Sequence, residues 1–303
     1  MNLSALASIL INIISPIVLV ALAGLVLART LGIDARPLSR IMLYIFTPAL
    51  VFGSAYRTQL SGEYVTIALF ALIVTALMGI VTWGLIKIMR YDRLTASGFA
   101  LGVLFVNAGN YGLPLILFAY GQEGLARAVV FFTVSAVLTQ TLAIFIAARG
   151  RASARDALRN VFKMPLVYAV TLGLVFNQIG VVVPDALMKS VDLAGGAAVP
   201  LMLTILGIEL AGATIQDDRV AIGLATTAKL IFTPLVAFPL AAVMGLQGVA
   251  RSVCIIEASM PTAVMASIVA VEFDAHPRLV TGIVLASTVF SIGTLTVLLE
   301  ILK

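Results

Sequence analysis

The chain has 303 residues, of which 61% are apolar and only 11% are charged, too few charges to cover the surface of a soluble domain of this length. The apolar residues occur in long runs, and a run of about 20 apolar residues crosses a bilayer as a helix, whereas barrel strands are shorter and alternate. The net charge is +5, but the basic residues lie in short loops between the runs, which excludes a nucleic-acid partner and indicates a multi-pass protein surrounded by membrane lipids.

The first apolar run, Leu3 to Ala28, has no Lys or Arg before Arg29. It lacks the positive start of a signal peptide and is too long for the apolar part of one, so we interpret it as a retained span. The chain as a whole predicts ten spans. They are Ala5–Ala28, Leu38–Tyr56, Tyr64–Ile86, Leu94–Tyr120, Val129–Ala148, Met164–Val183, Val191–Gly212, Val220–Val243, Val249–Val271 and Leu279–Leu302.

The loop charges predict the orientation. Thirteen basic residues follow odd-numbered spans and five lie on the opposite side. The first set is Arg29, Arg36, Arg40, Lys87, Arg90, Arg93, Arg149, Arg151, Arg155, Arg159, Lys163, Arg219 and Arg278, and the second is Arg57, Arg127, Lys189, Arg251 and Lys303. Because cytoplasmic loops carry the excess of positive charge, we expect both termini outside the cell (inner) membrane.

The basic segment between the fifth and sixth spans divides the chain into two halves. We predict a first five-helix repeat at 1–150, a cytoplasmic linker at 151–163 and a second repeat at 164–303. An odd number of spans per half gives the halves opposite orientations, as in inverted-repeat transporters. Pro48 and Pro200 occupy matching places, as do Pro114 and Pro261. The predicted fold is an all-α membrane protein with broken fourth and ninth helices that cross.

The fourth span contains the segment Val106–Pro114, which opposes a continuous helix. It combines Asn107, Asn110, two poorly helix-forming glycines and a proline without an N–H group. Broken backbone at membrane depth is tolerated where protein or a wet cavity covers it. We predict that Pro114 begins a new half-helix, whose free N–H groups and positive dipole end point into the protein.

The ninth span repeats this pattern, with Pro261 expected to begin its second half-helix. The two positive ends would then meet near the midplane and attract an anion. The predicted substrate-binding residues are Asn107, Asn110, Tyr111, Gly112, Pro114, Ser259, Met260, Pro261 and Thr262. Aligning the two prolines places Asn110 opposite Glu257. An ionisable group inside a span is functional by default, so we assign Glu257 to a proton or a coupling ion such as sodium.

Several of these residues have a plainer interpretation. Asn107 and Asn110 could merely cap a kinked helix, and Glu257 could be a structural ion-pair partner. Lys229, inside the eighth span, could contact substrate, snorkel or pair with an acid. Glu209 lies near a span end and could simply reach the interface. The polar set Thr133, Ser135, Thr139 and Gln140 combines helix packing with a partly wet face.

At these residues the sequence resembles the auxin efflux carrier family, PIN-like in plants and also containing bacterial organic-acid carriers. The likeness covers essentially the whole chain and is carried by Phe46–Leu50, Asn107–Pro114, Lys163–Pro165 and Glu257–Pro261. The resemblance implies a fold similar to that of bile-acid sodium symporters, with a scaffold of spans one, two, six and seven and a moving unit made of the rest. It also implies a homodimer and small carboxylate substrates such as malate, malonate or auxin-like acids.

We therefore expect a secondary transporter of small organic anions that works by elevator-type alternating access. The alternatives are a cation/proton antiporter, for which Glu257 alone is thin support, and a non-transporting membrane sensor. An enzyme is not expected, because the sequence has no convergent set of His, Cys or paired acids. A metal site is not expected either, since the single His276 and Cys254 have no ligand neighbours at suitable spacing. No cofactor is predicted beyond the possible sodium or proton coupling.

Overall fold

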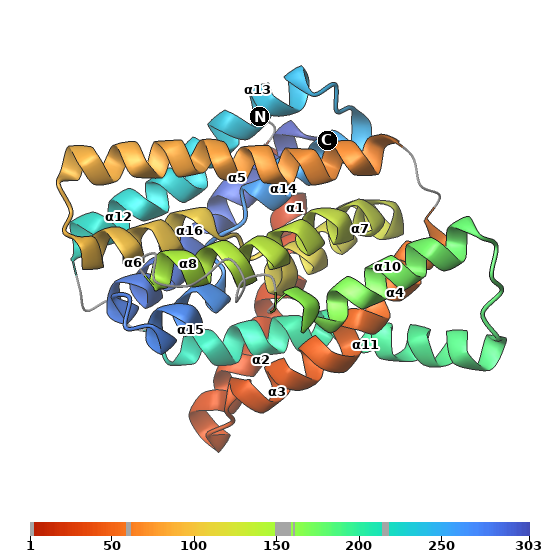
Figure 1. Cartoon of the computed structure of the whole chain (residues 1–303). Helices are drawn as coiled ribbons and strands as arrows, with labels where there is room; N and C mark the ends of the chain where they lie inside the picture. Colours follow the sequence, from red (N-terminus) through yellow and green to blue (C-terminus); the bar gives the residue numbers. More distant parts are fainter. Residues whose placement is uncertain (1–2, 59–61, 149–158, 160, 214–217) are drawn as a thin grey trace.

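The computed structural model describes residues 3–58, 62–148, 159, 161–213 and 218–303, and Figure 1 shows their arrangement. Within these residues the regular structure is helical, apart from one isolated antiparallel bridge. The first half contains α1 (Leu3–Ile9), η1 (Leu10–Ile14), α2 (Ser15–Leu31), α3 (Ala35–Ile41), η2 (Met42–Phe46), α4 (Thr47–Arg57), α5 (Gly62–Met89), α6 (Arg93–Leu104), η3 (Ala108–Gly112), α7 (Leu113–Leu138), η4 (Thr139–Ala143) and α8 (Ile144–Ala147). The second half contains α10 (Pro165–Gln178), α11 (Asp185–Ala211), α12 (Arg219–Thr227), η5 (Ala228–Phe232), α13 (Thr233–Val243), α14 (Gly248–Ala258), α15 (Val264–Glu272) and α16 (Pro277–Ile301).

The elements labelled η are single π-helical turns that continue the neighbouring α-helices. Seven of the resulting helices are long and apolar enough to cross a membrane: Leu3–Leu31, Ala35–Arg57, Gly62–Met89, Ala108–Ala147, Asp185–Ala211, Arg219–Val243 and Pro277–Ile301. Others, such as α6 and α10, are apolar but shorter. The protein is thus an all-α multi-pass membrane protein in its described residues. The linker predicted at 151–163 lies outside them, except for 159 and 161–163.

One group of helices consists of α2, α4, α10 and α11, with α11 packed against both α2 and α4, and α10 against α4. Gly24 on α2 and Gly207 on α11 face each other's helices so closely that a Cβ atom on either would collide with a backbone carbonyl oxygen. Small residues of this kind let membrane helices approach and gain van der Waals contact. These four helices lie together on one side of the molecule (Figure 1).

The remaining long helices form a second group. There α5 packs against α6, α7 and α13, while α16 packs against α6, α12 and α15. Most of its interior is apolar, and Phe70 of α5 lies against Phe131 of α7 with 6.4 Å between ring centroids. Within α7 the backbone turns sharply at Gly121, whose φ of 63° is open to glycine at little cost. That turn separates the half-helix Ala108–Tyr120 from the helix that follows.

The two broken helices meet at the isolated bridge, which joins Val106 and Thr262. The N–H of Asn107 donates to the Pro261 carbonyl at 2.8 Å, and the N–H of Ala263 donates to the Phe105 carbonyl at 2.9 Å. Each break thereby supplies the hydrogen bonds that the other has lost by leaving the helix. Both predicted breaks are present and pair with each other.

The predicted helix starts at the two prolines were wrong. The first half-helix begins at Ala108 with the π-helical turn η3, and Pro114 lies in the first turn of α7, which follows without a break. Pro261 lies inside the second break, and its half-helix begins at Val264. The pairing of the breaks explains the difference at Pro261. Its carbonyl accepts from the Asn107 N–H, which keeps the backbone there outside the helix, and the N–H that proline lacks is not needed in this pairing.

Candidate functional site

A cavity of about 420 Å³ lies between the two groups of helices. One wall comes from η2, α4 and α11, through residues such as Met42, Thr47 and Met202, and the other from the breaks, α7, η4 and α15. Most of the lining is apolar, including Leu43, Phe132, Ala136, Ile205 and Met265. Cavities of about 300–1,000 Å³ with a few placed polar groups are typical of small-molecule sites.

Both half-helix N-termini contribute to this cavity. Ala108, Gly109 and Asn110 line it from the start of the first half-helix. Ala263, Val264 and Met265 line it from the start of α15. The first N–H groups of a helix have no partner within the helix and carry the positive end of its dipole. Two such ends at one cavity make it favourable for negative charge.

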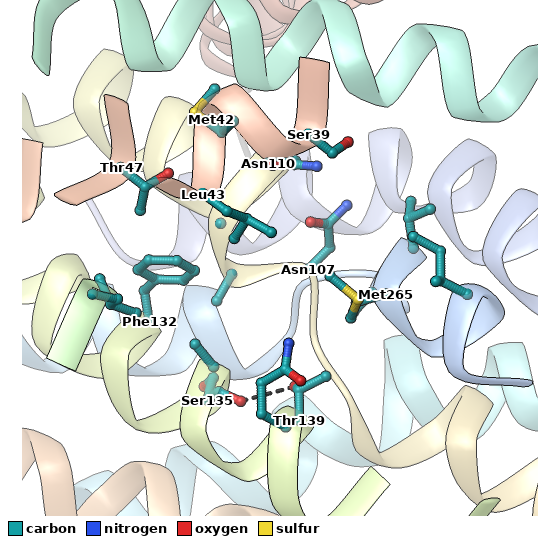
Figure 2. Close-up of a pocket in the computed structure, with 18 of the residues that line it drawn as sticks. Ser39, Met42, Leu43, Thr47, Asn107, Asn110, Phe132, Ser135, Thr139 and Met265 are labelled. Atoms are coloured by element: carbon teal, nitrogen blue, oxygen red, sulfur yellow. Dashed lines mark hydrogen bonds between the residues drawn. The ribbon is translucent and has the colours of Figure 1, made fainter. Parts of the chain in front are cut away.

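Asn107 adds a side-chain donor at the same place. Asn107 is only 5% exposed, and its Nδ2 has no hydrogen-bond partner among the described residues. Figure 2 shows the Asn107 and Asn110 side chains in the cavity, with Leu43 and Met265 flanking Asn107. A buried amide N–H₂ without a partner costs free energy. A ligand acceptor atom placed in the cavity would recover that cost.

The wall that contains the breaks also carries hydroxyl and amide groups from α7 and η4. Ser135, Thr139 and Gln140 line the cavity there, and the Thr139 hydroxyl donates to the Ser135 carbonyl at 2.8 Å (Figure 2). The Thr139 hydroxyl is therefore satisfied within its own helix. Thr133, from the same predicted polar set, does not line the cavity and donates to the Val129 carbonyl instead.

Three charged residues from the described part of the chain line the cavity. Lys163 and Glu272 are exposed, whereas Glu209 of α11 is partly buried and its Oε2 has no partner among the described residues. Lys163 and Glu272 therefore lie at an exposed mouth of the cavity. Its charge comes from two carboxylates and one ammonium group of the described residues.

Glu257 lies behind the cavity and does not line it. The residue is fully buried, and neither carboxylate oxygen has a hydrogen-bond partner among the described residues. The carboxylate is so close to Gly112 that a Cβ atom there would overlap it. Gly112, rather than the predicted Asn110, is thus the residue that faces Glu257 across the crossing. A buried carboxylate without partners is costly when ionised.

Of the predicted substrate-binding residues, Asn107 and Asn110 line the cavity. The other seven, Tyr111, Gly112, Pro114, Ser259, Met260, Pro261 and Thr262, are buried around the crossing and do not line it; their contact with a substrate stays a prediction. Glu209 lines the cavity, and Lys229 is buried away from it. Sequence reasoning missed Ser39, Met42, Thr47 and Phe132. Pro48, which matches Pro200 in the sequence, follows Thr47 directly and is the signal that could have marked this wall.

Comparison with known proteins agrees with the membrane architecture. A family described as "Membrane transport protein" matches residues 9–154 and 148–299. An uncharacterized transporter of Methanothermobacter thermautotrophicus is 30% identical over 292 residues, covering 94% of this chain and 95% of the relative. A second uncharacterized transporter, from Methanocaldococcus jannaschii, is 24% identical over 266 residues, covering 85% and 86%. The resemblance seen in the sequence is confirmed by these matches.

Proposed function

The chain belongs to the membrane transport protein family, and we propose that it is a secondary transporter of small organic anions, with the cavity as its binding site. The observation that carries the proposal is the meeting of both half-helix N-termini at one cavity beside the unpartnered amide of Asn107. Dipole ends and amide donors favour a carboxylate. The carboxylate would bind at Asn107 and Asn110, beside the two half-helix N-termini.

The lining favours one class of anion. Among the described residues, no arginine lines the cavity and the only basic group is Lys163, which is exposed at its mouth. A dicarboxylate would bury a second charge that this lining does not pair. A monocarboxylate with an apolar body would instead place that body against Leu43, Phe132 and Met265. We therefore place auxin-like or other apolar monocarboxylates ahead of malate and malonate.

The position of the cavity supports alternating access. It lies between the group α2, α4, α10, α11 and the group that carries both breaks. We propose that these are scaffold and moving unit, and that the second group carries the site across the membrane like an elevator. We also propose that the chain forms ten spans in two inverted repeats, at 1–150 and 164–303, joined by the linker 151–163. Inverted repeats of this kind underlie inward-open and outward-open states in secondary transporters.

Orientation follows from loop charge. We propose both termini outside the cell membrane, so that the mouth at Lys163 and Glu272 opens to the cytoplasm. With Cys254 replaced by alanine, Arg36→Cys should react with a membrane-impermeant thiol reagent only after the cells are opened. Lys189→Cys, on the opposite loops, should react in intact cells. The reverse pattern would invert the proposed topology.

We also propose a homodimer with α4 and α11 near the interface. Leu187 and Leu193 of α11 are 60% and 81% exposed, and a second copy could cover these side chains in place of lipid. The particle mass in lipid nanodiscs is the test. A monomeric mass in both nanodiscs and mild detergent would contradict the dimer.

Cation exchange is the second candidate, because Glu209 and Glu272 line the cavity and Glu209 has an oxygen without a partner. Uptake into proteoliposomes separates the two candidates. We expect saturable uptake of labelled indole-3-acetate and little uptake of its neutral amide, with malate in between or absent. Rubidium or sodium uptake without any response to carboxylates would favour cation exchange. No uptake of any of these, with binding of carboxylates retained, would favour a sensor.

A further inference from the structure

Lys229 is a buried basic residue to which the proposed transport site gives no role. The residue is 1% exposed and lies in η5, the π-helical turn between α12 and α13. Its Nζ donates to the Val103 carbonyl at 3.0 Å. Within the described residues no carboxylate pairs with it. Of the helices packed against η5, α6 has no acidic residue and α16 has only Glu300, in its last turn.

The amine lies at the broken end of α6. This helix ends at Leu104, so its last carbonyl groups lack partners within the helix and carry the negative end of its dipole. The Thr262 hydroxyl donates to the Gly102 carbonyl at 2.6 Å, and Lys229 donates to the next carbonyl along the chain. A cluster of carbonyl and hydroxyl oxygens at a half-helix C-terminus is the arrangement in which transporters coordinate sodium.

The end of α14, at the other break, differs. There the Ser259 hydroxyl donates to the Ile255 carbonyl at 2.6 Å, and the Ser259 N–H donates to the carbonyls of Ile255 and Ile256. The Met260 N–H donates to the Glu257 carbonyl at 3.3 Å. Within the described residues, that end is closed by its own turn and receives no side-chain hydrogen bond from another helix. The buried ammonium group is therefore specific to the end of α6.

We propose that the Lys229 ammonium group is a built-in cation that occupies the position of a coupling ion at the α6 end, so that this end takes no sodium. Lys229 is then a positioning residue: its charge holds the crossing together in every state of the cycle. The idea of a coupling ion rests on the proposed transport function, but the test of this inference does not require a transport measurement. If uptake of anions fails and the thermal result below holds, only the proposed function falls.

The test is the melting temperature of the purified protein in sodium chloride and in choline chloride at equal ionic strength. Lys229→Ala removes the ammonium group and frees the Val103 carbonyl. We expect this variant to melt lower than wild type in choline and to regain about 2–5 °C in sodium. Lys229→Arg keeps a positive charge and should gain no sodium response beyond that of wild type. Lys229→Ala without a gained sodium response would overturn the proposal, as would an equal gain in Lys229→Arg.

Two further measurements keep the test decisive. If Lys229→Ala cannot be purified folded, Lys229→Gln, which retains a neutral donor for the Val103 carbonyl, should still gain a smaller sodium response; no gain overturns the proposal. Any sodium response of wild type should vanish in Glu257→Gln, because Glu257 is the other candidate for the ion. A wild-type sodium response that survives Glu257→Gln would show that the α6 end accepts sodium beside the amine, and would also overturn the proposal.

Discussion

The two breaks pair with each other through main-chain hydrogen bonds, but the side chains around them make different contacts. At the first break, Asn107 and Asn110 extend into the cavity and the preceding helix end is capped by Lys229 and Thr262 from elsewhere in the chain. At the second break the helix end is closed by Ser259, and the charged residue is Glu257, with no partner among the described residues. The two breaks thus share a backbone arrangement but differ in buried charge, with a lysine at the first and a glutamate at the second.

This difference separates two tasks. The first break supplies donor side chains to the cavity, whereas the second supplies the N-terminus of α15 and keeps its carboxylate behind the wall. Glu209 and Glu272 already place carboxylates on the lining, and a third one inside the cavity would add to the repulsion of an anionic ligand. The position of Glu257 behind Gly112 therefore matters as much as its charge. Variants at the two breaks should therefore differ in kind as well as in size.

The largest expected effect is on binding through the first break. Asn107→Ala and Asn110→Ala each remove an amide donor, and a hydrogen bond to a charged group contributes about 1.5–3 kcal/mol. We expect carboxylate affinity to fall about 10- to 100-fold in each. Asn12→Ala is the matched control, since Asn12 is an exposed residue whose side-chain amide donates to the Ser8 hydroxyl. Loss of membrane insertion together with binding would instead favour a capping role for the asparagines.

Gly112→Ala tests the contact between the breaks. The added Cβ would overlap the Glu257 carboxylate, and crowding of this kind costs about 1–3 kcal/mol. The melting temperature should fall by several degrees in detergent. In a Glu257→Ala background the same change has room, so its cost should largely disappear. Equal costs in both backgrounds would mean that the two residues do not touch.

Thr262→Val and Ser259→Ala compare the two helix ends directly. Thr262→Val leaves the buried Gly102 carbonyl without the Thr262 hydroxyl, which should cost about 1–3 kcal/mol. Ser259→Ala should cost less, because the Ile255 carbonyl still receives the Ser259 N–H. Thermal melts of both variants measure the difference. A larger loss in Ser259→Ala would refute the asymmetry between the ends.

The smallest expected change in basal binding comes from Glu257→Gln, which removes the charge and nearly keeps the shape. Carboxylate binding should persist, while the dependence of transport on pH or sodium should flatten if Glu257 carries the proton or ion. Uptake measured across pH and sodium concentration tests this. Wild-type dependence on both would leave Glu257 with a structural role.

Much of the fold was predictable, because apolar runs and helix-breaking residues are local signals. Val106–Pro114 gave the first break, and Glu257–Pro261 gave the second. The start of each half-helix was not predictable, since it depends on the pairing of Asn107 with Pro261, which lie far apart in the sequence. The same reason explains why Gly112, and not Asn110, faces Glu257.

The candidate site was predicted in part. Asn107 and Asn110 stood out because polar side chains are costly in lipid. The facing wall at Met42, Thr47 and Met202 could not be predicted, because apolar residues on a span carry no signal for which of them meets a cavity. The contact of Lys229 with the Val103 carbonyl could not be predicted either, since it joins a helix of the second half to a break in the first half.

The most direct test of the account is an experimental structure with a bound carboxylate such as indole-3-acetate. We expect the carboxylate about 2.7–3.1 Å from the Asn107 amide nitrogen and beside the N–H groups at the start of α15. The ring should lie against Phe132 and Leu43. A carboxylate bound at Lys163 in the mouth, with the Asn107 amide still without a partner, would contradict the claim that the crossed half-helices form the anion site.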